Sequence, residues 1–284
     1  MDKDFHYYAI QQLAIDAGFT EEDAYTISFS SMYVDDCTDL DLAREMSDRY
    51  VINYYPIITQ VDVTNILLYH AQHYILMPFH FLPGEQDKRN PYVVVENSSS
   101  SRILLNKAIE AQNLIQLGIA LHAYADTFSH QNFTAFEEEQ NAVYNWQTLY
   151  RVVVPNIGHC DVGHLPDNVE ETWMDYRLPK GQRRVDNKRR TLNALAGCYL
   201  ALNCFKKGKC LSSVSNLFFE LLGGHYSFWE DWVNLESYDD RIGVLIDSHD
   251  RKYFEHCTSY HDKNFINFQN AAKNQVALVL RLAP

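Results

Sequence analysis

The stretch LHAYADTFSH, residues 121–130, lies at the end of the clearest helical segment of this sequence, residues 102–131. Apolar residues recur at helical spacing through that segment, which predicts a long helix packed in a core. His122, Asp126 and His130 stand four residues apart. On a helix they form one ridge, each about 40° around and about 6 Å along from the last. Ionisable side chains on a buried helix need partners, so this ridge is the first candidate site.

The composition of the ridge favours metal binding. Imidazole nitrogens and carboxylate oxygens are ligands that zinc prefers, and a carboxylate between two imidazoles can bridge neighbouring ions. The alternative is three polar residues on a solvated helix face. Apolar neighbours such as Leu121 and Ala125 leave little of this helix for solvent, so the sequence favours a buried metal site.

Helical periodicity runs through most of the chain, and strand signals are scarce. We therefore predict an all-α fold in a single multi-helix domain, residues 1–284. Thr20, followed three residues later by Asp23, is typical of a helix start. Two irregular stretches, 78–101 and 155–186, carry histidines among turn-forming residues. The expected helices besides 102–131 are 5–17, 21–34, 39–52, 137–153, 187–206, 211–222, 239–256 and 263–281.

Composition limits the function classes. With 284 residues and 46% hydrophobic content, the chain can bury one large core. Its formal charge of −13 repels duplex nucleic acid and anionic membranes, unless bound metal reverses the local field. Six cysteines without CxxC spacing argue against a disulfide framework or a cysteine-rich zinc knot. Because no apolar run is long enough to span a bilayer and no secretory signal is evident, we expect a cytoplasmic protein without a transmembrane segment.

Further ligand-type side chains lie in four short segments: DFH near the start, MYVDD, PFHFLPG and GHCDVGHLPD. Taken singly, each also fits a helix cap, a solvated helix end or a hydrogen-bonded loop residue. Together with the ridge they place the predicted metal site within residues 4–167. The candidates are Asp4, His6, Asp35, Asp36, His80, His159, His164 and Asp167, with Asp161 as a less favoured extra.

On the motifs HAYADTFSHQ, DFHYYA, YVDD and GHxxxGHxPD, the chain resembles the superfamily of zinc-dependent phospholipase C and the single-strand-specific zinc nucleases. It looks most like an uncharacterised bacterial branch, and the likeness covers residues 4–175. The resemblance implies an all-helical fold around three zinc ions. It implies a first zinc on Asp35 or Asp36 with His80, His122 and Asp126, a second on His6 with Asp126 as the bridge, and a third on His130 with residues from His159, His164 and Asp167.

Two features depart from the superfamily pattern. Its secreted members chelate zinc through an amino-terminal tryptophan, whereas residue 1 here is Met, and Asp4 is the candidate in its place. His130 follows Asp126 by only four residues, and the third element lacks the histidine-to-acid spacing of four. The metal cluster is therefore a firmer expectation than any substrate.

The leading hypothesis is a metal-dependent hydrolase of phosphoester bonds that uses two or three zinc ions. Asp35 or Asp36 would orient or deprotonate the attacking water. A phospholipid, a nucleotide-type molecule and single-stranded nucleic acid remain candidate substrates, and the acidic surface weighs against the last. The basic run 177–190 could contact a phosphate, although such runs are usually solvated.

Two rival hypotheses belong to other classes. One is a catalytically silent binding or scaffold protein that metal stabilises, with the same fold. Structural zinc sites are closed, whereas catalytic sites keep a position for water, so metal content together with an activity screen separates it from a hydrolase. The other, ranked last, is a helical histidine–aspartate phosphohydrolase, a class that uses an adjacent His-Asp pair.

Overall fold

The computed structural model describes residues 1–38, 57–84, 90–144, 154–209, 211 and 264–284. This part of the chain is mostly helical, in agreement with the predicted all-α class. Its strands form one two-stranded antiparallel sheet, β1 (Thr172–Met174) and β2 (Arg184–Asp186). No helix in these ranges is long and apolar enough to cross a membrane.

The amino-terminal residues are helical where helices over 5–17 and 21–34 were predicted. A π-helical turn, η1 (Asp4–Ala9), continues directly into α1 (Ile10–Asp16). Gly18 follows with a φ of +86°, a backbone conformation that suits glycine at a helix end. Thr20 then caps α2 (Glu21–Asp36), because its hydroxyl accepts a hydrogen bond from the main-chain N–H of Asp23 at 3.1 Å.

The segment predicted as one helix over 102–131 is two helices, so that prediction is wrong in its middle. Helix α6 (Ser99–Ala111) ends at Gln112, which adopts a left-handed conformation with a φ of +49°. Asn113 then starts α7 (Leu114–Ser129), and its side chain accepts from the N–H groups of residues 115 and 116. This side-chain cap offers the backbone a better arrangement than continuing α6.

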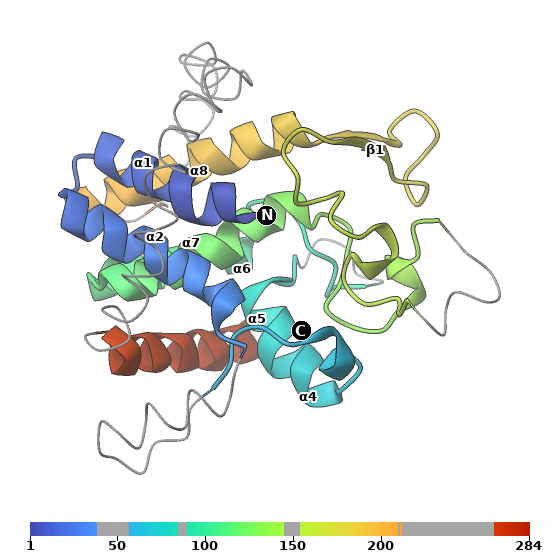
Figure 1. Ribbon diagram of the computed structural model, residues 1–284, viewed down its shortest axis with the longest axis horizontal. Helices are drawn as coiled ribbons and strands as arrows, with labels where there is room; N and C mark the ends of the chain where they lie inside the picture. Colours follow the sequence, from blue (N-terminus) through green and yellow to red (C-terminus); the bar gives the residue numbers. More distant parts are fainter. Residues whose placement is uncertain (39–56, 85–89, 145–153, 210, 212–263) are drawn as a thin grey trace.

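Helix α7 is the centre of the core. It packs against α2, α6 and α8 (Asn187–Lys207), as Figure 1 shows, and every residue from 117 to 129 is buried. Gly118 permits the close approach of α2, because a Cβ there would lie 2.3 Å from the carbonyl oxygen of Ile27. Burial therefore extends from the predicted apolar face to all sides of α7, so the polar side chains of this helix are shielded from bulk solvent.

The other helices predicted from the sequence are confirmed where the structure describes them, apart from the one over 137–153. The helices expected at 187–206 and 263–281 are confirmed as α8 and as a helix over 264–282. Short helical turns between residues 63 and 79, namely η2 (Val63–Asn65), α4 (Tyr69–Ala71), η3 (Gln72–Leu76) and α5 (Met77–Phe79), were not predicted. The helices expected at 39–52 and 239–256, and all of 211–222 except residue 211, lie outside the described residues.

The prediction of a helix over 137–153 is wrong for residues 137–144. Only one 3₁₀ turn, η4 (Glu139–Asn141), forms there. The buried Asn141 amide accepts from the N–H of Thr134 and donates to the carbonyl oxygens of residues 134, 136 and 156. These bonds hold a compact loop, since they satisfy backbone groups that a helix would have used otherwise.

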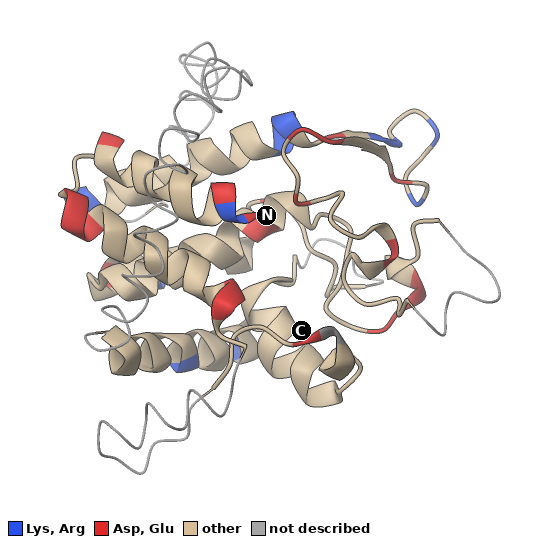
Figure 2. Cartoon of the chain, viewed as in Figure 1, with Lys and Arg blue, Asp and Glu red and all other residues tan. Residues whose placement is uncertain are grey.

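The predicted irregular region 155–186 is confirmed, with a 3₁₀ turn, η6 (Cys160–Val162), and the β1–β2 hairpin inside it. Figure 2 marks basic residues along this hairpin and at the start of α8, and acidic residues at the end of α2 and beside the amino terminus. Arg177 within the basic run is already engaged, because it pairs with Asp175 at 2.7 Å and stacks on the ring of Phe133.

Candidate metal centre

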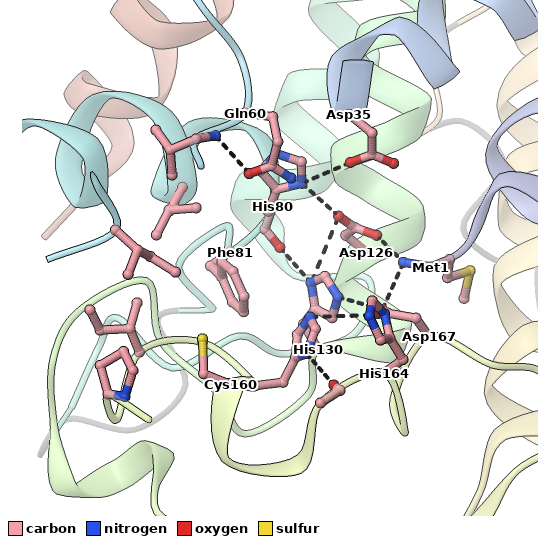
Figure 3. A pocket seen from close by; sticks show the side chains of 18 of the residues that line it. Met1, Asp35, Gln60, His80, Phe81, Asp126, His130, Cys160, His164 and Asp167 are labelled. Atoms are coloured by element: carbon pink, nitrogen blue, oxygen red, sulfur yellow. Dashed lines mark hydrogen bonds and ion pairs between the residues drawn. The ribbon is translucent and has the colours of Figure 1, made fainter. Parts of the chain in front are cut away.

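The predicted ligands converge at one end of α7. His122 and Asp126 project from α7 itself, and His130 is the residue that caps its carboxyl end rather than a member of the helix. Asp35 comes from the last turn of α2, and His6 from η1. Figure 3 shows His80, Asp126, His130 and Asp167 pointing toward one another around the amino group of Met1.

Asp126 lies at the centre of this cluster and is 1% exposed. Its Oδ1 lies 2.7 Å from the Met1 amine and 3.1 Å from Nε2 of His6. Its Oδ2 faces the other way, 3.3 Å from Nδ1 of His80 and 3.4 Å from Nε2 of His122. Because each oxygen faces a separate set of nitrogen atoms, the carboxylate has the arrangement of a bridging ligand.

The first ligand group contains His80, His122 and Asp126, whose ligand atoms all lie within 4.8 Å of one another. Asp35 borders this group, with its Oδ1 3.8 Å from Nδ1 of His80 and 3.6 Å from Nε2 of His122. Nδ1 of His80 and Nε2 of His122 face each other at 3.2 Å. Two imidazole nitrogens and two carboxylates therefore meet at one point.

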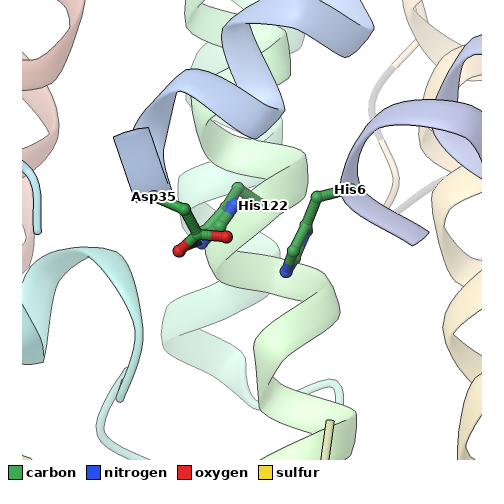
Figure 4. A group of neighbouring side chains, drawn as sticks. All are labelled: His6, Asp35 and His122. Carbon is green, nitrogen blue, oxygen red and sulfur yellow. Dashed lines mark ion pairs between the residues drawn. The ribbon is translucent and has the colours of Figure 1, made fainter. Parts of the chain in front are cut away.

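The second group contains His6, Asp35 and His122, drawn in Figure 4. The rings of His6 and His122 stack with centroids 3.8 Å apart. Burial, together with His122 and the Met1 amine, lowers the pKa of His6 to about 3. The ring is therefore neutral near pH 7, which is the form that binds metal. Within the described residues, Nδ1 of both His6 and His122 is buried without a hydrogen-bond partner.

The third group contains His130, His159 and Asp167. Nε2 of His130 lies 2.8 Å from Oδ1 of Asp167, and Nε2 of His159 lies 3.3 Å from Oδ2 of the same carboxylate. Asp167 is therefore placed between two imidazoles, as Asp126 is. Its Oδ1 also lies 3.0 Å from the Met1 amine, which connects this group to the first two.

Three of these histidines share an orienting contact with the backbone. Nε2 of His80 meets the carbonyl of Thr59 at 3.0 Å, Nδ1 of His130 meets that of residue 80 at 2.9 Å, and Nδ1 of His159 meets that of Gly163 at 2.7 Å. A carbonyl oxygen only accepts, so in each ring this nitrogen carries a hydrogen and the other nitrogen is turned toward a carboxylate. A lone pair and a carboxylate oxygen repel unless a proton or a cation lies between them.

The charges of the cluster are also compatible with a bound cation. Burial raises the pKa of Asp126, but the Met1 amine and His130 outweigh it and hold the pKa well below its usual range. For the Met1 amine, burial lowers the pKa, yet Asp126 and Asp167 raise it to about 11. The carboxylates of Asp126 and Asp167, whose side chains are 1% and 9% exposed, thus share one ammonium group, with a third carboxylate, Asp35, beside them. Buried negative charge in excess of positive charge is costly unless a metal ion compensates it.

The cluster opens into a cavity of about 550 Å³. Its lining combines ligand side chains with apolar ones such as Ile66, Leu76, Phe81 and Ile157. Figure 3 shows Phe81 beside the histidines, and its ring stacks on that of His130 with centroids 4.7 Å apart. A molecule in this cavity would contact both the candidate metal ligands and apolar side chains.

Some of the predicted ligand residues lie in the ligand groups, and others do not. Asp4 and Asp36 belong to none of the ligand groups, although burial and the neighbouring Asp35 raise the pKa of Asp36 to about 6. The carboxylate of Asp161 faces away, since its Oδ2 accepts from the N–H groups of residues 143 and 144. His164 joins Asp167 in a fourth group. The predicted residues that lie in one or more groups are His6, Asp35, His80, His122, Asp126, His130, His159, His164 and Asp167.

Two groups at the site were missed from the sequence. They are the Met1 amine and the carboxylate of Asp2, which lies in the fourth group with His164 and Asp167. No local pattern marks the amine, because its position depends on how η1 docks against α7. Asp2 stands four residues before His6, a helical spacing that could have pointed to it.

Comparison with known proteins gives a family but no activity. No curated protein matches the chain, and no solved structure does. A protein family of unknown function, DUF6765, matches residues 1–282, which include every ligand group described above. The chain therefore belongs to the family DUF6765.

Proposed function

We propose that this protein is a metal-dependent hydrolase of phosphoester bonds that holds two or three zinc ions in the His/Asp cluster. The observation that carries the proposal is the orientation of His80, His130 and His159. Each donates one ring N–H to a main-chain carbonyl and turns the other nitrogen to a carboxylate. Hydrogen bonds of this kind are typical of metal-ligating histidines, because they fix the tautomer and the ring direction.

The donor set suits zinc. Mixed imidazole nitrogen and carboxylate oxygen ligands are those of catalytic zinc sites, whereas all-oxygen sites favour magnesium or calcium. Asp126 contacts His80 of the first group and His6 of the second. Asp167 belongs to the third and fourth groups, so both carboxylates are suited to support neighbouring ions. Zinc at such a site polarises a phosphoryl oxygen and lowers the pKa of bound water.

The residues of this chain would divide the remaining work. The Asp35 side chain is 26% exposed and lines the cavity, so it is the carboxylate placed to orient or deprotonate a water molecule. Asp36 lies outside the ligand groups and the cavity lining, which favours Asp35 of the two predicted candidates. The apolar side chains in the cavity lining fit a phosphoester with an apolar or aromatic part, such as a phospholipid or nucleotide.

The basic run 177–190 contributes little to this proposal. Arg177 is held by Asp175 and Phe133. Arg190 donates to the carbonyl of Ser129 at 2.9 Å, where it steadies the end of α7. Neither residue lines the cavity, so substrate recognition by the cluster itself is the simpler account.

The rival is a binding or scaffold protein that metal stabilises. A structural zinc site is closed to water, whereas the ligand groups here border a cavity of about 550 Å³. The position of the ligand groups beside this cavity favours the hydrolase over the scaffold protein. The third class, histidine–aspartate phosphohydrolases, needs an adjacent His-Asp pair. The sequence contains two, His249–Asp250 and His261–Asp262, both outside the described residues, and the cluster uses neither.

The test combines metal analysis with an activity screen. We expect protein purified without added metal to contain two to three equivalents of zinc and to hydrolyse a generic phosphodiester or phosphomonoester. Chelation should abolish activity and lower the melting temperature, and zinc should restore both, since binding energy in a buried site is folding energy. Bound zinc without turnover on any phosphoester would favour the scaffold. Fully folded protein that neither holds nor responds to zinc would end both hypotheses.

A further inference from the structure

A fourth ligand group lies at the mouth of the cavity, where it shares Asp167 with the third group and is more exposed than the other three. It consists of Asp2, His164 and Asp167, whose ligand atoms lie within 4.8 Å of one another. His164 is exposed, Asp2 and Asp167 are half-buried, and all three line the cavity. The group is therefore open to solvent, unlike the groups built on His6, His80 and His122.

The backbone fixes these three residues in place. The carbonyl of Asp2 accepts from the N–H groups of Phe5 and His6 at the start of η1. His164 and Asp167 lie on one turn, because the carbonyl of His164 accepts from the N–H of Asp167 at 3.1 Å. The buried amide of Asn187 donates to the carbonyls of residues 165 and 168 and so holds that turn against α8. Hydrogen bonds thus hold the backbone on which all three side chains stand.

Asp167 links this group to the buried ones. Its oxygens face His130 and His159 on the inner side, and His164 and Asp2 complete a second set on the outer side. The two histidines of the 158–167 loop therefore have different places: His159 faces inward, and His164 faces the mouth. Figure 3 shows His164 and Asp167 next to each other beside Met1.

We propose that Asp2, His164 and Asp167 form a separate, exchangeable zinc site at the cavity mouth. One imidazole and two carboxylates give a nitrogen–oxygen donor set that suits zinc. Three protein ligands leave a coordination position for water. Because His164 is exposed, the ion exchanges with solvent, whereas the ions on the buried groups do not. This site is additional to the hydrolase centre and does not depend on hydrolysis.

The experiment counts zinc in two classes. Purified protein is desalted to leave the tightly held metal, which is counted by elemental analysis, and is then titrated with zinc chloride by isothermal calorimetry. We expect the wild-type protein to bind one further equivalent that a second desalting removes. His164→Ala and Asp2→Asn should each lose this exchangeable equivalent and keep the tightly held ones. The control is His70→Ala, because His70 is an exposed histidine outside the four groups, and it should keep both classes.

Two results would overturn the proposal. One is retention of the exchangeable equivalent in both His164→Ala and Asp2→Asn. The other is loss of a tightly held equivalent in His164→Ala, which would assign that residue to the buried cluster instead. Elemental analysis counts the tightly held zinc, and calorimetry counts the exchangeable zinc. A protein without tightly held zinc would therefore contradict the proposed hydrolase, while calorimetry would still test the site at the cavity mouth. A circular dichroism spectrum of each variant establishes that it is folded.

Discussion

Asp126→Asn is the most direct test of the cluster, because it keeps the shape of the side chain and removes the charge. The carboxylate of Asp126 has three short nitrogen contacts: 2.7 Å to the Met1 amine, 3.1 Å to Nε2 of His6 and 3.3 Å to Nδ1 of His80. These contacts lie on both oxygens. A neutral amide offers one oxygen, and its NH₂ group would face nitrogen atoms on the other side.

The size of the effect follows from these contacts. A hydrogen bond to a charged group contributes about 1.5–3 kcal/mol, and one between neutral groups about 0.5–1.5 kcal/mol. Loss of the charge therefore removes about 1–1.5 kcal/mol at each contact. Over the three contacts, the free energy of unfolding of the metal-free protein should fall by about 3–5 kcal/mol, which agrees with the usual cost of breaking a buried ion pair. This is a large share of the stability of an ordinary domain, about 5–15 kcal/mol.

In the metal-loaded protein, Asp126→Asn should reduce bound zinc by more than one equivalent and abolish phosphoester hydrolysis. The assays are elemental analysis, urea denaturation of the metal-free protein and hydrolysis at matched protein concentration and pH. The control is Asp161→Asn, because Oδ2 of Asp161 accepts two main-chain N–H groups at 2.8 Å each, and an amide oxygen can do the same. If Asp126→Asn keeps every metal ion and its activity, Asp126 does not bridge metals.

Three further substitutions test other parts of the structure. His122→Ala should lower zinc content and melting temperature together, because His122 belongs to two ligand groups. Gly118→Ala should destabilise the fold by about 1–3 kcal/mol in urea denaturation, because its Cβ would lie 2.3 Å from the carbonyl oxygen of Ile27 and push α2 from α7. Asn187→Ala should cost about 2–4 kcal/mol and loosen the turn that carries Asp167, since two carbonyls lose their donor, and the 165–168 amides should exchange hydrogen faster.

Each of these substitutions has an outcome that would contradict its reasoning. Unchanged zinc stoichiometry in His122→Ala would show that the α7 ridge is not the ligand face. Wild-type stability of Gly118→Ala would mean that α2 and α7 separate at little cost, and Gly181→Ala, with no atom near its Cβ, is the matched control. Unchanged hydrogen exchange over 165–168 in Asn187→Ala would show that another contact holds this turn.

The features predicted well from the sequence are local ones. The ridge on α7 follows from a spacing of four residues, and the start of α2 follows from the Thr20–Asp23 pair. Both depend on neighbours within one or two helical turns, so a single segment of sequence contains the whole signal. The break at Gln112 and Asn113 was also a local signal, because asparagine is a favoured helix cap, but the apolar pattern on either side obscured it.

The features that could not be predicted depend on long-range docking. Candidate ligands in η1, α2 and the 158–167 loop could be predicted only from their residue type. The sequence did not show which of these side chains would lie together in one ligand group. Asp35 and Asp36 are adjacent, yet only Asp35 lies in a ligand group, because successive residues of a helix point about 100° apart. His159 and His164 differ for a similar reason, since the turn between them sends one ring inward and the other to the mouth.

Phe81 shows how a residue that binds no metal can position one that does. Its ring stacks on His130, and Gly158 lies against the end of the same ring, where a Cβ would be 2.4 Å from Cζ of Phe81. Gly158→Ala should therefore displace Phe81 and, with it, His130. Because orienting contacts of metal ligands change affinity by about 10–100-fold, we expect the zinc affinity of the His130 group to fall by that factor. Competition with a chromophoric chelator measures it.

The control for Gly158→Ala must separate backbone strain from displacement of the ring. Gly158 has a φ of +52°, where alanine is strained in any surroundings. Gly208 at the end of α8 has a φ of +59° and no atom within 4 Å of its Cβ position, so Gly208→Ala carries a similar backbone cost without touching the cluster. We expect both variants to lose some stability and only Gly158→Ala to lose zinc affinity. Equal zinc affinity in the two variants would mean that Phe81 does not hold His130 in place.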